Sequence, residues 1–219
     1  MSHPMYGVYP AKVVDVADPD AQGRVKIGLP WLEAAEGRYE AWARLTTLMA
    51  GPGRGSWFVP DPGDEVLVAF EHGDPRHPYI LGALWNGVDQ PPEAMDGAGS
   101  NPVRAICTRS GLKLRFSEDK DRPEILIEVP GGGSLALRLR DRQVELRDHH
   151  GNAFSFSAQG ASIRCAAALE IEATKVNLSA GAVTVNAGVT RFSGVVQCET
   201  LLANSVVASQ YTPGAGNVL

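Results

Sequence analysis

The side chains that could bind a metal or act as nucleophiles are few in this chain and lie far apart. Its three cysteines are Cys107, Cys165 and Cys198. Their spacing matches no metal-binding or redox motif, and an odd number of cysteines does not make a disulfide framework. We therefore interpret them as small, buried hydrophobic residues of a protein made in a reducing compartment.

Two histidine pairs are the other candidates for a metal site. His72 and His77 are separated by a Gly-Asp-Pro turn, which makes a poor metal pair. His149 and His150 are adjacent, and in a trimer six imidazoles could approach one axis and bind a metal. Neighbouring residues on a strand point to opposite faces, however, so at most one ring per chain would face inward. We expect a solvated turn here and no metal site.

The chain also lacks the usual signs of an enzyme. Its acidic run Glu118–Asp121 lies in a mixed-charge segment between two strand-like clusters, where we expect solvated side chains. There is no Gly-rich phosphate loop ending in Lys-Ser/Thr and no Gly-x-Ser-x-Gly turn. We predict a non-enzymatic protein with no catalytic, cofactor-binding or metal-binding residues, and no His-x-His metal site at its C-terminus.

Composition favours an all-β protein with many short strands. The 219 residues are 44% hydrophobic, enough for a core, and they include 24 glycines and 15 prolines between short apolar runs. The net charge of −5 offers no basic excess to attract nucleic acid or anionic lipid. The first ten residues show no signal peptide, and no apolar stretch approaches the roughly 20 residues of a membrane helix. We expect synthesis and assembly in the cytoplasm.

Residues 1–87 carry the pattern of a small closed barrel. Gly- and Pro-containing turns, such as those at residues 18–20, 51–53, 61–63 and 73–75, separate several short apolar runs. About five short strands in some 80 residues are typical of an OB-type barrel. The predicted strands are Gly7–Val16, Arg24–Leu29, Tyr39–Leu48, Glu65–Phe70 and Tyr79–Leu84.

Residues 88–104 form a linker by composition, with adjacent prolines and nothing that would pack. Residues 105–205 then alternate apolar and polar positions, which predicts one short strand per cluster. The clusters are Leu112/Leu114/Phe116, Ile125/Ile127/Val129, Leu135/Leu137/Leu139, Val144/Leu146, Phe154/Phe156, Ile163/Cys165, Leu169/Ile171, Val176/Leu178 and Val183/Val185.

The spacing of these clusters predicts a β-helical needle. From residue 135 their starts are 9, 10, 9, 6, 7 and 7 residues apart, and a short repeat over many units indicates a solenoid or β-helix. Such strands would leave unpaired edges and one uncovered apolar face. Three identical chains wound round one axis would remove both problems. A single-chain β-helix would also pair its edges, but its coils need about 20 residues, a period absent here.

Charge falls toward the end of the predicted needle. Residues 102–150 contain 18 charged side chains, whereas residues 176–219 contain only Arg191 and Glu199. This gradient fits a shaft of shrinking cross-section. Residues 206–219 form a turn-rich tip segment, which is either a frayed end or a platform for another protein.

An ordered series of motifs in the barrel region carries a family resemblance. It comprises Gln22–Trp31 (QGRVKIGLPW), Trp42-Ala43-Arg44, Gly51–Gly55 and Pro60–Gly82 (PDPGDEVLVAFEHGDPRHPYILG). Over about residues 6–87 the chain resembles the OB domain of baseplate assembly protein V, the central spike of contractile phage tails. It is also similar to the spike part of the valine-glycine repeat proteins of type VI secretion. Cys107–Gly111 and the PGAGN tail resemble the same families.

Several residues of these motifs have a structural role in our interpretation. Pro62, Gly63, Gly73 and Pro75 set tight turns, and Asp74 hydrogen-bonds the backbone of its own turn. Two further groups of residues have roles that follow from their side-chain type. Val66, Val68 and Phe70 point into the barrel, while Trp31, Trp42 and Trp57 anchor the barrel wall or a subunit contact.

The resemblance implies a homotrimeric structural spike of a contractile injection particle. The barrel end would dock on a separate trimeric hub, the needle would pierce a target envelope, and the C-terminal end would seat a tip protein or effector. No lysozyme domain interrupts residues 88–104, and we expect none of the hub domain that precedes type VI barrels. Two alternatives remain open: an OB module for single-stranded nucleic acid or glycan, and a trimeric fibre adhesin.

Overall fold

The computed structural model describes residues 4–34 and 37–210, with only the backbone of residues 33 and 34. The chain divides into two compact units, Met1–Leu169 and Glu170–Leu219, each described by itself. Strands and one 3₁₀ turn, η1 (Glu71–Gly73), make up the regular structure of the described residues. The predicted all-β class is confirmed.

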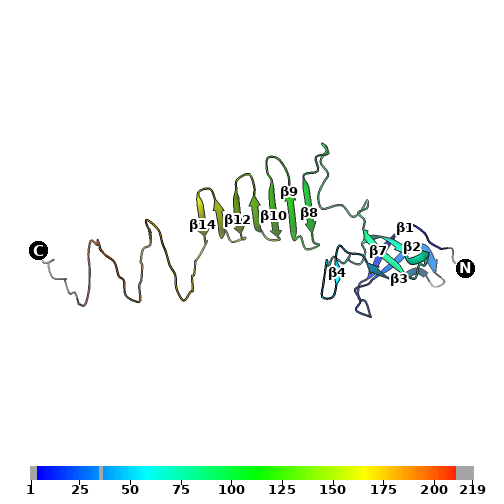
Figure 1. Cartoon of the computed structure of the whole chain (residues 1–219), viewed down its shortest axis with the longest axis horizontal. Coiled ribbons are helices and arrows are strands. Elements are labelled where there is room, and N and C mark those ends of the chain that lie inside the picture. The colour runs from blue at the N-terminus through cyan, green and yellow to red at the C-terminus, as the bar shows by residue number, and fades with distance from the viewer. Residues whose placement is uncertain (1–3, 35–36, 211–219) are drawn as a thin grey trace. The chain divides into compact units, whose positions relative to one another are not determined.

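A closed barrel of five strands forms the N-terminal part of the first unit (Figure 1). Its strand order is β1-β2-β3-β7-β6, with antiparallel neighbours except for the parallel contact of β3 with β7, where Arg44 lies opposite Tyr79. All five predicted strands are present; the bounds of β6 agree with the prediction and those of the other four are shifted. They are β1 (Val8–Asp15), β2 (Val25–Ala34), β3 (Gly37–Leu45), β6 (Glu65–Phe70) and β7 (Pro78–Ala83).

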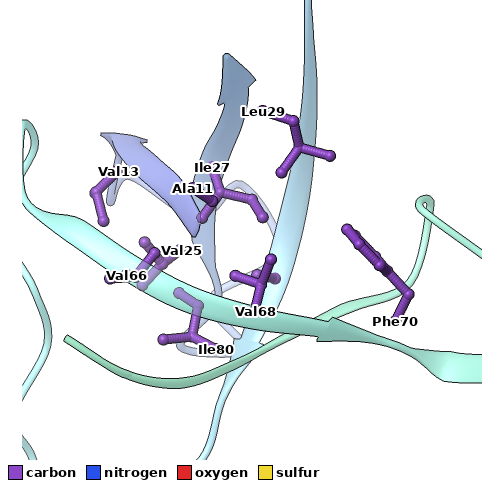
Figure 2. Close-up of a cluster of buried hydrophobic side chains, with 10 residues drawn as sticks. Ala11, Val13, Val25, Ile27, Leu29, Val66, Val68, Phe70 and Ile80 are labelled. Atoms are coloured by element: carbon purple, nitrogen blue, oxygen red, sulfur yellow. The ribbon is translucent and has the colours of Figure 1, made fainter. Parts of the chain in front are cut away.

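Alternation along the strands fills this barrel with aliphatic side chains. In β6 every second residue is buried, so Val66, Val68 and Phe70 point inward as predicted. Ile27 and Leu29 of β2 are completely buried and converge on the same cluster (Figure 2). Because the sheet closes on itself, this core needs no second layer.

The turn between β1 and β2 is built on the carboxylate of Asp18. Its oxygens accept backbone N–H groups of Asp20, Gln22 and Arg24 at 2.8–3.1 Å. They also pair with the Arg24 guanidinium, Nη2 to Oδ1 at 2.6 Å. The side-chain hydrogen bond from Arg24, followed by the backbone N–H donors, holds the pKa of Asp18 well below its usual range.

A small hairpin projects between β3 and β6. It consists of β4 (Ala50–Gly51) and β5 (Arg54–Gly55), paired antiparallel. The Ser56 N–H donates to the Met49 carbonyl at 2.9 Å, and the Thr47 hydroxyl donates to the Ser56 carbonyl at 2.7 Å. These bonds extend the pairing beyond the two short strands.

A seven-stranded antiparallel sheet follows the barrel in the chain. Its strands run in sequence order from β8 to β14, each paired with the next (Figure 1). Each strand has five or six residues, and tight turns join most neighbours. The strands are β8 (Val103–Cys107), β9 (Lys113–Ser117), β10 (Glu124–Val129), β11 (Gly133–Arg138), β12 (Gln143–Arg147), β13 (Ala153–Ser157) and β14 (Gly160–Arg164).

Strand pairing stops after β14. The clusters Leu169/Ile171, Val176/Leu178 and Val183/Val185 were expected to be strands, but residues 165–210 contain none in the isolated chain. A strand exists only where another backbone offers its hydrogen-bonding groups, and no other described segment of the chain does so here. The six side chains named above are 57–76% exposed. An intertwined β-helix for this segment stays a prediction.

We expect the substitution Ile27→Ala to destabilise the barrel by about 2–5 kcal/mol, because it leaves a cavity in a core with little freedom to collapse. All four tryptophans lie between residues 31 and 85, so their fluorescence during denaturant unfolding reports on the barrel. Val14→Ala, at a position 44% exposed, is the matched control and should change the stability by less than about 0.5 kcal/mol. Equal losses in the two variants would contradict the assigned core.

We expect Asp18→Asn to lower barrel stability at pH 7 and to matter less in acid. The folded-state pKa of Asp18 lies below its unfolded value, so its stabilisation is complete above that value, about 4, and is lost as the pH falls toward the folded pKa. Urea unfolding of wild type and variant at pH 7 and pH 3 measures this difference. A difference in unfolding free energy that is as large or larger at pH 3 would contradict this expectation. Asp141→Asn, at an exposed turn, is the control.

Candidate assembly surface

Strand register gathers the apolar side chains of the seven-stranded sheet on one face. Residues opposite each other in neighbouring strands share a face, and the pairs Leu114↔Ile127 and Leu146↔Phe154 show the pattern. We call this surface the apolar face. Its two rows are Ile106, Leu114, Ile127, Leu135, Leu146, Phe154 and Ile163, and Phe116, Ile125, Leu137, Val144 and Phe156.

The apolar face is uncovered in the isolated chain. Phe156 is 47% exposed, Leu146 52% and Ile163 57%, and exposure is greatest toward the end of the sheet. The rings of Phe154 and Phe156 meet edge-on with centroids 4.7 Å apart. Both rings nevertheless remain partly in solvent. A contiguous apolar patch of this kind on a monomer marks a surface that another molecule covers.

The opposite face carries a ladder of ion pairs. Glu145 receives Arg147 at 2.6 Å and Arg138 at 2.8 Å, and Arg138 and Arg115 both approach Glu124 at 3.6–3.7 Å. The side chains of Glu124 and Glu145 are only 8% exposed beneath the arginines. Hydrogen bonds from Arg147, then Arg138, lower the pKa of Glu145. This face satisfies its own polar groups, so it needs no partner.

One residue of the predicted linker binds this ladder. Glu93 pairs with the Lys113 ammonium and lies 3.7 Å from Nε of Arg115. The hydrogen bond from Lys113 lowers the pKa of Glu93. The linker composition had indicated nothing that would pack, and that interpretation is wrong for Glu93. A lone glutamate among prolines carries no sequence signal for such a contact.

The four histidines of the described residues, His72, His77, His149 and His150, lie in turns or a bend. His149 and His150 are exposed in the turn between β12 and β13, with ring centroids 3.7 Å apart, so the expected solvated turn is present. His72 is exposed, and His77 Nδ1 lies 3.4 Å from the Asp74 carboxylate. Across residues 4–34 and 37–210, no three His, Cys, Asp or Glu side chains gather as metal ligands would.

Of two further sequence predictions, the acidic run agrees with the structure and the cysteines do not. Glu118–Asp121 lies in the exposed turn between β9 and β10. The cysteine prediction is wrong for the isolated chain, because Cys107 and Cys198 are exposed and Cys165 is half-buried. Their segments have no second layer over them in one chain, so a small apolar residue there stays in solvent.

The three tryptophans contribute unequally to the barrel wall. Trp31 stacks on Tyr9, with centroids 4.8 Å apart, and its Nε1 donates to the Pro10 carbonyl at 2.7 Å. Trp42 is half-buried beside the Arg24 guanidinium. Trp57 is 77% exposed, with the edge of its ring beside Gly23, so most of its indole is left in solvent.

The Gly/Pro turns behave as predicted. Gly63 and Gly73 have φ of +103° and +77°, values that a side chain would make strained. Asp74 accepts the backbone N–H of Arg76 at 3.0 Å and pairs with its guanidinium. No helix among the described residues has the length and apolar character to cross a membrane.

Comparison with known proteins finds a family model that matches the barrel region. Residues 9–85 match the family model of the type VI secretion system/phage-baseplate injector OB domain. The type VI secretion system spike protein VgrG3 of Vibrio cholerae is 27% identical over 136 residues, covering 60% of this chain and 13% of that protein. VgrG1c of Pseudomonas aeruginosa, a spike protein of the same system, is 34% identical over 137 residues, 60% of this chain and 18% of its own length.

A third relative is named as a toxin. The actin cross-linking toxin VgrG1 of Vibrio cholerae is 30% identical over 115 residues, 50% of this chain and 10% of that protein. The chain thus spans between 10% and 18% of these three relatives. The closed barrel thus contains the segment that matches the injector OB domain. The resemblance to baseplate and type VI spike proteins is confirmed.

We expect Glu93→Gln to release residues 88–102 from the sheet, because the loss of charge weakens the pairs with Lys113 and Arg115. Limited proteolysis with thermolysin, read by mass spectrometry, should then show cleavage near Met95 several-fold faster than in wild type. Glu118→Gln, which removes an exposed pair with Arg104, is the control and should leave that rate unchanged. Equal rates in all three proteins would show that Glu93 does not hold the segment.

Proposed function

We propose that this chain is the structural central spike of a contractile injection particle and acts as a homotrimer. The observation that carries the proposal is the uncovered apolar face of the sheet that follows an injector OB barrel. Three copies that place these faces around one axis bury them in a shared core. The extended residues 170–210 find in the other two copies the backbone partners that a single chain lacks.

The proposed mechanism is mechanical rather than chemical. The barrel end docks on a trimeric hub, and sheath contraction drives the needle through the target envelope. A closed three-chain shaft transmits force because each strand is hydrogen-bonded on both sides. The ion-pair ladder lies on the solvent side, where charged groups keep the particle soluble. The C-terminal segment, whose last residues lie outside the described part, seats a tip protein or effector.

We propose no catalytic activity for the chain itself. This chain covers only 10% of the toxin among its relatives, and we do not assign the toxin's activity to it. The particle assembles in the cytoplasm and then acts outside the cell, with transient contact to the target membrane. A nucleic-acid partner finds little support in the net charge of −5.

We expect light scattering to give a mass three times the 23.3 kDa of one chain at micromolar concentration. Phe154→Asp should reduce this mass, because it places a carboxylate in the proposed shared core, where an unpaired charge is costly. Ser155→Asp, the neighbour on the opposite face of β13, is the matched control and should remain trimeric.

Two results would overturn the trimer. A wild-type monomer at micromolar concentration would exclude the shared core, and a dimer would replace it with two stacked sheets. If Ser155→Asp dissociated the assembly while Phe154→Asp did not, the interface would lie on the ladder face instead.

A further inference from the structure

The hairpin arm, defined here as residues 46–60, is a built structure rather than a loose loop. At its base the Thr46 backbone N–H and hydroxyl both donate to the Ile80 carbonyl of β7, at 3.0 and 2.8 Å. At Gly55 the chain passes so close to the Met49 carbonyl that a Cβ would lie 2.8 Å from its oxygen. These contacts define the path of the arm's backbone.

These side chains are large, apolar and exposed. Leu48 is 98% exposed, Trp57 77%, Phe58 66% and Met49 53%, although solvated hairpins usually carry polar residues at such positions. Arg54 is the single charged residue of the arm. Tryptophan with neighbouring large apolar residues is the composition of the energetic centre of an interface.

The apolar surface of the arm continues toward the apolar face of the sheet. Trp57 and Phe58 line a cavity of about 660 Å³ together with Ile106 and Cys107 of β8. Ile106 is the first member of the apolar face. An ion pair between Arg109 and Asp61, 3.1 Å apart, joins the segments that flank this cavity. A molecule that covers Ile106 therefore lies next to Trp57 and Phe58.

We propose that the hairpin arm docks on a second copy of this chain within the trimer, at the barrel-proximal end of its sheet. This inference rests on the proposed trimer and extends it from the sheets to the barrels. A nearly uncharged arm suits permanent burial between subunits, as in obligate oligomers, better than reversible docking on a separate partner. Repeated three times, the contact of each arm with the next copy closes into a ring.

Photo-crosslinking of the full chain tests this proposal. The photoreactive p-benzoylphenylalanine replaces Leu48 in one variant and Asp20, in the exposed β1–β2 turn, in the control. After irradiation of the purified trimer, the Leu48 variant should give several-fold more covalent dimer and trimer on a denaturing gel than the control. Mass spectrometry should map the crosslinks to residues near β8 or the arm of another copy.

The possible failures are distinguishable. A Leu48 variant that is trimeric by light scattering yet runs as a single chain after irradiation overturns the docking of the arm and leaves the trimer intact; the arm would then belong to another protein, such as the hub. A variant and wild type that are both monomeric overturn the trimer and the arm contact together.

Discussion

The structure depends on one constraint: a β-sheet with an apolar face and unpaired edges cannot stand alone in water. The barrel meets this constraint within one chain, because β3 and β7 close the sheet and Ile27, Val66 and Val68 fill its interior. The sheet from β8 to β14 does not meet it. Its ladder face is satisfied by ion pairs, while the side of Phe154 and Ile163 is left to solvent.

This contrast separates a barrel with a buried core of its own from a sheet whose apolar face is uncovered in one chain. Barrel residues reach complete burial, whereas the apolar face is most exposed at its end, at Ile163 of β14, and exposure is general after residue 165. The last strand is β14, and residues 165–210 form no further antiparallel pair. The proposed trimer would supply both the missing strand partners and the missing layer.

Polar interactions in this protein position segments rather than perform chemistry. Asp18 organises the β1–β2 turn, Asp74 the turn before β7, and Glu93 holds the segment that connects barrel and sheet. Each is a carboxylate whose pKa is lowered by hydrogen bonds from a neighbouring cation. A lowered carboxylate pKa therefore marks structural joints in this protein.

The sequence by itself was sufficient for the all-β class, the five barrel strands, the inward-facing Val66, Val68 and Phe70, and the strands from β9 to β14. Alternation and Gly/Pro turns encode these features locally, because each depends on a few neighbouring residues. It also predicted strands around Ile171 and Val185, where the periodicity is equally clear. There the isolated chain forms none, because pairing requires a partner that no local pattern specifies.

Only the tertiary structure decided what depends on contacts between distant residues. Strand register placed Leu146 against Phe154 and made two continuous apolar rows from separate clusters. It also brought Glu145 between Arg138 and Arg147, and the fold carried Glu93 across to Lys113. Cys107 and Cys198, expected to be buried, are exposed for the same reason: burial depends on a second layer, and that layer is not encoded within one stretch of sequence.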